Sequence, residues 1–320
     1  MSEAALSKKV VYSALAGNLF VAVIKFIAAA ITGSSSMVSE AVHSLVDTGN
    51  EGLLLYGYFR ASREPDETHP LGYGREIYFW SFIVALLIFT LGAGASIYEG
   101  ISYILKPRPI SDVGVNYIVL ALSALFEGSS WFVGVKRFGK YKGRRGYWEA
   151  LRESKDPPSY MVVFEDSAAL TGIMIAVLGN FLSGYLNMPA LDGVASILIG
   201  LVLATVAIML ARKNKTLLIG ERASDEVIES IMGLARSEPS VDGANSVFAV
   251  HLSPDQILVA LSLEFADELR TPQIEAAVIR LEKRIREKHP QVIALFIKPQ
   301  TRRSYEQMIA RRRSDTDNTA

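Results

Sequence analysis

Four polar side chains lie at helical spacing within an otherwise apolar stretch, "SEAVHSLVDTGNE" at residues 39–51. Glu40, His43, Asp47 and Asn50 are three or four positions apart, and such positions share one face of a helix. Ionisable groups at membrane depth are costly, so they face a protein interior or water and mark functional sites. An imidazole beside a carboxylate can bind a divalent cation or a proton. The alternative is a buried hydrogen-bonded pair that only orders the helices.

A second acidic position interrupts a later apolar stretch, "MVVFEDSAALTGIMIAV" at residues 161–177. Glu165 and Asp166 are adjacent, so on a helix they point about 100° apart and only one of them is expected to face a given partner. His43, Asp47 and Asp166 together would supply one imidazole and two carboxylates. That set suits a tetrahedral divalent-metal site whose fourth place is taken by water or another side chain.

The elements that must position these groups are six apolar stretches, each long enough to cross a bilayer as a helix. They cover residues 10–32, 37–58, 77–104, 113–135, 160–184 and 190–211. Hydrophobic residues make up 50% of the 320-residue chain. Two further acids in these stretches, Glu99 and Glu127, are expected at helix-packing or interfacial positions. The sequence therefore predicts an α-helical membrane protein with six transmembrane helices.

Basic residues occur in alternate loops, which sets the orientation. The loop from Lys136 to Lys155 is rich in lysine and arginine, whereas the loop around Asn187 has none. Both termini are therefore expected in the cytoplasm. A first span without a cleavage site suggests a bacterial cytoplasmic membrane, with an organelle membrane as the alternative host. Lysine plus arginine and aspartate plus glutamate number 33 each, so no global charge favours a nucleic-acid partner. Topology and contact with anionic lipid explain the basic loop.

The pattern of apolar residues changes near residue 216, where the long apolar stretches end, and this predicts a second domain. Its order is helix, two strands, helix, strand, with the strands at "SVFAVHL", "ILVALSLEF" and "VIALFI". This order is typical of a cytoplasmic ferredoxin-like α+β domain. The expected boundaries are 1–215 for the transmembrane domain, 216–300 for the α+β domain and 301–320 for a disordered polar tail.

The residue inventory also limits the chemistry. The chain has no cysteine, so imidazole, carboxylate, amide or water must hold any metal. A membrane-embedded hydrolase is a competing class, but the sequence contains no HExxH, no GxSxG and no paired-aspartate motif. The protein is therefore not expected to be an enzyme.

The order of these features resembles the cation diffusion facilitator family over residues 8–300. The resemblance rests on the six spans, "HSLVD", the acidic turn in the fifth span, "HPLGYGRE", "PALDGVASILIG" and the ferredoxin-like domain. It implies a homodimeric antiporter that exports a divalent metal, most often zinc, from the cytoplasm in exchange for protons. The metal is then the transported substrate, and no prosthetic group is expected.

The resemblance also implies a transport site. The family takes two ligands four positions apart from the second span and two from the fifth. His43 and Asp47 match the first pair, and Asp166 matches the second member of the other pair. Val162 stands at the first member of that pair and is not a ligand.

The fourth ligand is then expected to be Asn50, water, or Glu165 after a local helix rotation. Asn50 or water is preferred, because Asn50 shares the face of His43 and Asp47. With fewer imidazoles and more oxygen ligands, manganese, iron and cobalt become credible substrates beside zinc. A metal sensor or scaffold that does not transport is a further alternative.

Two other metal positions of the family are only partly matched. In "PDETHPLGYGRE", Asp66 and His69 match two ligands of a peripheral site, while Tyr73 stands where another histidine would be. The alternative is that Asp66 and His69 pair with Arg63 or Arg75.

In the α+β domain, Asn245, Ser262 and Lys298 stand at positions where relatives bind metal. The domain is therefore expected to dimerise without a metal cluster.

Overall fold

The computed structural model describes residues 3–108, 112–141 and 146–317. The chain separates into two compact units. The first takes in the residues up to Arg63 together with Glu76–Lys215, and the second takes in Glu64–Arg75 and the residues from Thr216 onward. The 64–75 loop therefore belongs with the second unit, although the sequence suggests a single membrane domain over 1–215. Part of the expected basic loop, at 142–145, lies outside the described residues.

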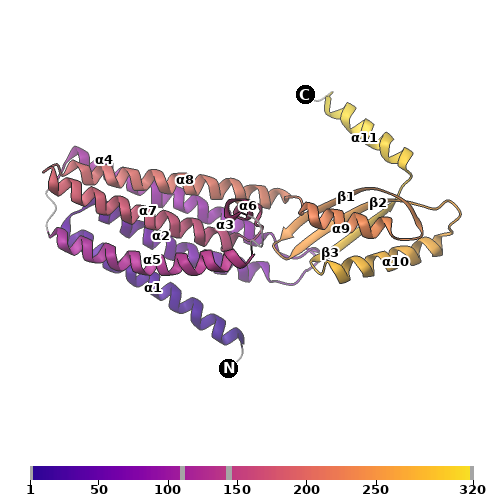
Figure 1. The fold of residues 1–320 in the computed structure, drawn as a ribbon, viewed down its shortest axis with the longest axis horizontal. Coiled ribbons are helices and arrows are strands. Elements are labelled where there is room, and N and C mark those ends of the chain that lie inside the picture. The colour runs from indigo at the N-terminus through magenta and orange to yellow at the C-terminus, as the bar shows by residue number, and fades with distance from the viewer. Residues whose placement is uncertain (1–2, 109–111, 142–145, 318–320) are drawn as a thin grey trace. The chain divides into compact units, whose positions relative to one another are not determined.

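The first unit is a bundle of long helices that run side by side (Figure 1). Its elements are α1 (Glu3–Thr32), α2 (Ser35–Ala61), α3 (Glu76–Leu87), η1 (Ile88–Ala93), α4 (Gly94–Leu105), α5 (Val113–Tyr141), α6 (Tyr147–Glu153), α7 (Pro157–Tyr185) and α8 (Ala190–Gly220). Within the described ranges, five helical segments are long and apolar enough to cross a membrane: α1, α3–η1–α4, α5, α7 and α8. The sixth predicted span is α2, which packs against α1 and α7 and has the polar stripe that lowers its hydropathy.

Polar contacts fix where α2 begins. Gly33 adopts a positive φ of 68° in the turn after α1, and the Ser34 side chain caps α2. The carboxylate of Asp192, in the first turn of α8, accepts hydrogen bonds from the backbone N–H of Ser35 at 2.5 Å and of Ser36 at 3.3 Å. A carboxylate is favoured at a helix N-terminus, so Asp192 ties the start of α2 to α8.

The third and sixth spans approach closely through glycine. A Cβ atom on Gly100 of α4 would lie 2.5 Å from the carbonyl oxygen of Gly193 in α8. One on Gly200 of α8 would lie 3.0 Å from the carbonyl oxygen of Ala93. Small residues in membrane helices allow this kind of backbone contact. The third span also differs from a continuous α-helix, because Ile88–Ala93 forms a π-helical segment.

The second unit has the predicted order of elements. They are α9 (Asp225–Arg236), β1 (Val241–Ser253), β2 (Gln256–Phe265), α10 (Thr271–Lys288) and β3 (Val292–Pro299). The sheet order is β1-β2-β3, with β1 antiparallel to β2 and β2 parallel to β3, so α10 forms the crossover between the parallel strands. Its core includes Ile231 and Leu281 from the helices and Val259, Leu261 and Leu263 from the central strand. The ferredoxin-like arrangement is confirmed.

The sheet has an apolar row on the face turned away from this core. Phe248 pairs with Ala260, and Ala260 pairs with Phe296 in the next strand. Their neighbours Ala249, Leu261 and Ile297 contact the core, and successive side chains in a strand alternate between faces. Phe248 is 53% exposed and Phe296 is 59% exposed. We call Phe248, Ala260 and Phe296 the aromatic row.

The C-terminal tail is helical where the sequence suggests disorder. The helix α11 covers Arg302–Asp317. Arginine, glutamate, glutamine, methionine and alanine are good helix formers, and Arg302 forms a 3.1 Å ion pair with Glu306 one turn away. These local preferences outweigh the polar composition that favours disorder. The last three residues, 318–320, lie outside the described chain.

Candidate metal site in the membrane unit

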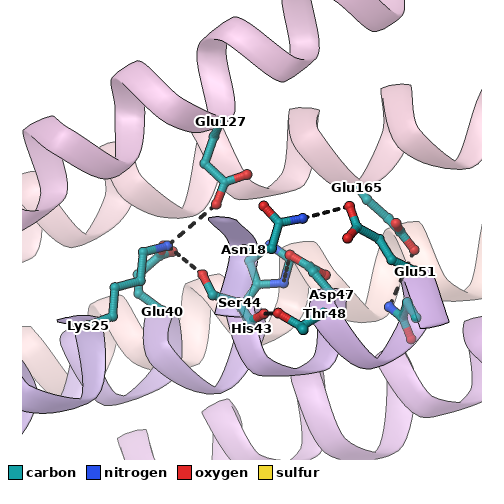
Figure 2. Close-up of polar contacts among 11 residues, drawn as sticks. Asn18, Lys25, Glu40, His43, Ser44, Asp47, Thr48, Glu51, Glu127 and Glu165 are labelled. Carbon is teal, nitrogen blue, oxygen red and sulfur yellow. Dashed lines mark hydrogen bonds and ion pairs between the residues drawn. The ribbon is translucent and has the colours of Figure 1, made fainter. Parts of the chain in front are cut away.

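The polar stripe of α2 is buried in the first unit. His43 is 2% exposed, and its Nδ1 lies 3.2 Å from Oδ2 of Asp47, as the four-residue spacing predicts (Figure 2). Over the part of the chain that the structure describes, Nε2 of His43 and Oδ1 of Asp47 have no hydrogen-bond partner. An imidazole nitrogen and a carboxylate oxygen in this situation are suited to bind a cation or a proton.

A small cavity is lined by residues of α1, α2, α5 and α7. Its volume is about 100 Å³, enough for a few water molecules. Asp47 from α2 lines it together with Val162 and Asp166 from α7. Oδ2 of Asp166 has no hydrogen-bond partner in the described ranges. The structure therefore places Asp47 and Asp166 at one cavity, and His43 adjoins the cavity through Asp47.

Glu165 also lines this cavity, contrary to the expectation that only one of the adjacent acids faces it. It is buried, and Nδ2 of Asn50 donates to its Oε1 at 3.4 Å. Two neighbouring residues on a helix can border one opening when the opening spans the 100° between them. Asn50, expected to share the face of His43 and Asp47, thus contacts a residue that lines the same cavity as Asp47.

Besides the hydroxyls of Ser44 and Ser130, four charged or amide side chains near the cavity were not anticipated from the sequence as part of the site. Asn18, Glu51 and Glu127 line it, and Nδ2 of Asn18 donates to Oε1 of Glu51 at 2.6 Å. The fourth is Lys25, which is fully buried on α1 and contacts Glu127. The available signal was the spacing: Asn18 and Lys25 are seven positions apart on α1, and Glu51 follows Asp47 by four. Glu127, expected at a packing position, belongs to the site.

The donor set fits a divalent cation, although the side chains are not gathered around one point. As placed, the described chain has no group of three histidine, aspartate or glutamate side chains that could hold a metal ion. One imidazole with several carboxylates is a set that zinc, manganese, iron or cobalt accepts. Joint ligation by His43, Asp47 and Asp166 therefore requires the side chains of α2 and α7 to converge.

At the predicted peripheral site, the Asp66 carboxylate accepts hydrogen bonds from other residues of its own loop. The backbone N–H of His69 donates to Oδ1 of Asp66 at 2.7 Å, and the Tyr73 hydroxyl donates to Oδ2 of Asp66 at 2.6 Å. The rings of His69 and Tyr73 lie 4.3 Å apart. The hydrogen bond from Tyr73, followed by that from His69, lowers the pKa of Asp66. His69 Nδ1 lies 3.6 Å from Oδ1 of Asp66, so the two expected ligands are neighbours.

In the second unit, Asn245 and Ser262 form hydrogen bonds with Gln300, which directly follows β3. The family resemblance implies that relatives bind metal at both positions. Nδ2 of Asn245 donates to the carbonyl oxygen of Gln300 at 2.8 Å, and the Ser262 hydroxyl donates to Oε1 of Gln300 at 3.1 Å. These contacts connect β1 and β2 to the segment that follows β3.

The comparisons with known proteins show the family of the chain. A family model described as "Cation efflux transmembrane domain" matches residues 11–219. The human protein named "Proton-coupled zinc antiporter SLC30A9, mitochondrial" is 30% identical over 323 residues, which cover 89% of this chain and 57% of that protein. "Metal tolerance protein C4" of Arabidopsis thaliana is 30% identical over 265 residues, which cover 82% of this chain and 58% of that protein.

A bacterial relative matches over most of both chains. "Cation-efflux pump FieF" of Shigella flexneri is 25% identical over 273 residues, which cover 83% of this chain and 84% of that protein. The two longer relatives, in contrast, are matched over little more than half of their length. The family model spans more than half of this chain and includes both helices of the candidate site. The chain belongs to the cation efflux family, also called the cation diffusion facilitator family.

Proposed function

We propose that this chain is a secondary transporter that exports a divalent transition-metal cation, zinc first, from the cytoplasm in exchange for protons. The observation that supports it most directly is the cavity to which α2 contributes Asp47 and α7 contributes Asp166, with His43 beside Asp47. Membership of the cation efflux family agrees with this function. So do the relatives named as a zinc antiporter and a cation-efflux pump.

Exchange follows from competition at the ligands. A metal ligand must be deprotonated, so a proton and a metal ion compete for His43, Asp47 and Asp166. Imidazole is the ligand whose unperturbed protonation changes near neutral pH, which makes His43 the proposed proton carrier. At cytoplasmic pH the site takes up the cation. When the site faces a more acidic compartment, protons displace the cation and the protonated site returns.

Access requires the two helices of the site to move relative to the rest of the bundle. We propose that α1, α2, α5 and α7 form one moving group, as the family resemblance implies. Within this group α2 packs against α1 and α7, although it also packs against α3 and α4. The glycine contacts of α4 with α8 hold the other group together. A larger cavity of about 440 Å³, lined by Tyr58, Arg137, Asp156 and Ser159, shares Val162 with the site cavity. We propose it as the cytoplasmic entrance.

The choice of metal depends on the ligands. One imidazole and two carboxylates bind zinc, but this set discriminates against manganese, iron or cobalt less than a site with two imidazoles. We propose zinc because relatives carry that name, with manganese, iron and cobalt as alternatives. The proposed setting is a multi-pass homodimer in a bacterial cytoplasmic membrane, with both termini and the 216–300 domain in the cytoplasm.

A proton-flux assay with a panel of metals tests the proposal. The wild-type chain is reconstituted in liposomes that contain a pH-sensitive dye, and Zn²⁺, Mn²⁺, Fe²⁺, Co²⁺ and Mg²⁺ are added in turn. We expect Zn²⁺ to drive the fastest proton movement and Mg²⁺ to drive none above that of empty liposomes. If no metal drives proton movement above that of empty liposomes, the result would favour a sensor or scaffold that does not transport.

A further inference from the structure

A lysine lies buried beside the candidate site, surrounded by oxygen atoms. The Lys25 side chain of α1 is 0% exposed. Its Nζ lies 2.8 Å from Oγ of Ser44, 3.1 Å from Oε2 of Glu40 and 3.8 Å from Oε1 of Glu127 (Figure 2). Ser44 and Glu40 belong to α2, and Glu127 belongs to α5. The ammonium group therefore occupies a position bounded by oxygen atoms of two other helices.

The position is built around Glu40. This side chain is 0% exposed, and its Oε1 has no hydrogen-bond partner within the ranges that the structure describes. Oε1 of Glu40 occupies the place that a Cβ atom on Gly172 of α7 would take. Glycine at 172 thus gives room to a carboxylate that has one oxygen turned to Lys25 and the other unsatisfied. A buried carboxylate without a cation would be strongly unfavourable.

The same position opens towards the transport cavity. Ser44 and Glu127, which contact the lysine, also line the cavity that contains Asp47 and Asp166. Two carboxylates and a hydroxyl are oxygen donors of the kind that hard divalent cations prefer. Without the ammonium, Glu40, Ser44 and Glu127 would offer these donors to a second ion beside the cavity.

We propose that the ammonium of Lys25 is a tethered cation that fills a second cation-binding position, formed by Glu40, Ser44 and Glu127, next to the transport site. The position would take a hard divalent cation such as Mn²⁺ once the lysine charge is removed. In the wild-type chain, Lys25 restricts the membrane unit to one metal ion. This inference rests on the proposed function and extends it to the number of ions bound. Lys25 is here a positioning residue, because it acts on the site through Glu40 and Glu127.

Counting bound ions tests this inference. The full chain in lipid nanodiscs is equilibrated with Mn²⁺ alone, and bound metal per chain is measured by mass spectrometry for the wild type, Lys25→Met and Lys25→Arg. We expect Lys25→Met to bind one more Mn²⁺ per chain than the wild type, and Lys25→Arg to bind the wild-type number because the charge is kept. Equal numbers for the wild type and Lys25→Met would overturn the inference.

A second variant covers the case in which Lys25→Met does not insert. The double variant Lys25→Met with Glu40→Gln removes both charges of the closest pair, so it should insert and bind the wild-type number of ions. Failure of only the single variant to insert would support the ammonium as the cation that Glu40 needs. Failure of both would overturn that role.

The His43→Ala background separates this inference from the proposed function. If the transport site is correct, His43→Ala loses one ion, and adding Lys25→Met restores one at the second position. If the transport site is elsewhere, His43→Ala binds as the wild type does, while Lys25→Met still adds an ion. A gain in neither background would overturn the tethered cation alone.

Discussion

Val162 is the residue at which this chain departs from the four-ligand pattern that the family resemblance implies. Its side chain lines the same cavity as Asp47 and Asp166, and it also lines the larger neighbouring cavity. The departure therefore lies at the site itself. With an apolar side chain at this place, the cavity that Val162 lines still has the carboxylates of Asp47 and Asp166, and carboxylates bind a wide range of divalent cations.

Replacing this valine by histidine should change the metal preference. We expect Val162→His to raise the affinity for zinc relative to manganese roughly tenfold, equivalent to about 1.4 kcal/mol, because imidazole favours zinc. Competition between the two ions in the liposome flux assay measures the ratio. Met174→His, which places the same ring at an exposed position of α7, is the control and should leave the ratio unchanged. An unchanged ratio for Val162→His would contradict ligation at this position.

The Asp66 loop provides a prediction on protonation. Since the Tyr73 hydroxyl is the main cause of the lowered pKa of Asp66, Tyr73→Phe should raise this pKa towards the ordinary value of about 3.9. NMR of chain labelled with ¹³C at aspartate carboxyls measures the titration, with Tyr305→Phe as the control. The hydrogen bond stabilises the loop above the unfolded-state pKa, and this contribution disappears as the pH falls through the lowered pKa. An unchanged Asp66 titration would contradict the assigned cause.

Residue spacing within one helix predicts part of the site. The His43–Asp47 contact follows from a separation of four on α2, and the place of Asp166 follows from the family pattern. The roles of Lys25 and Glu165 depend on contacts between helices, namely Lys25 with Glu40 and Glu165 with Asn50. Hydrophobic periodicity predicts which face of each helix points inward. It does not predict which residues on the inward faces of two helices contact each other.

The elements themselves follow more closely from the sequence. Long apolar runs predict the membrane helices, and β-rich runs predict β1, β2 and β3 and their order along the chain. Three features differ: the π-helical segment Ile88–Ala93, the short helix α6 within the expected basic loop, and the helix α11. A π segment depends on how a helix packs against its neighbours, so composition does not reveal it. The helix at Arg302–Asp317 was not predicted, because disordered tails have the same polar composition.

Glycine at position 100 should be needed for the packing of α4 on α8. A Cβ atom there would meet the backbone of α8, which cannot move aside as a side chain does. We expect Gly100→Ala to destabilise the protein by about 1–3 kcal/mol, seen as a lower Tm in detergent. Gly184→Ala is the matched control, because no atom lies within 4 Å of the added methyl group. Equal Tm values for Gly100→Ala and the control would contradict the close approach.

The two units of the whole molecule carry different parts of the proposed function. The membrane unit contains the ligands, and the second unit has the aromatic row on the sheet face opposite its core. An exposed apolar surface of this kind is typical of an association surface. We propose that it contributes to the homodimer.

A charge within the aromatic row should therefore weaken the dimer. We expect Phe248→Lys to shift the full chain in detergent towards monomer by at least tenfold in dissociation constant, because two lysines would be brought into an apolar interface. Mass photometry measures the populations. Ile279→Lys, at a similarly exposed position of α10, is the control and should leave them unchanged. A Phe248→Lys dimer as stable as the wild type would place the interface elsewhere.

The central claim is that His43 and Asp47 of α2, with Asp166 of α7, exchange a divalent metal for protons. Proton flux driven by zinc in liposomes is the most direct measurement, made with His43→Ala, Asp47→Ala and, as a control, His69→Ala in the loop outside the bundle. We predict that both site variants insert and dimerise normally but lose metal-driven proton flux, while His69→Ala keeps it. Flux at the wild-type rate in both His43→Ala and Asp47→Ala would contradict the account.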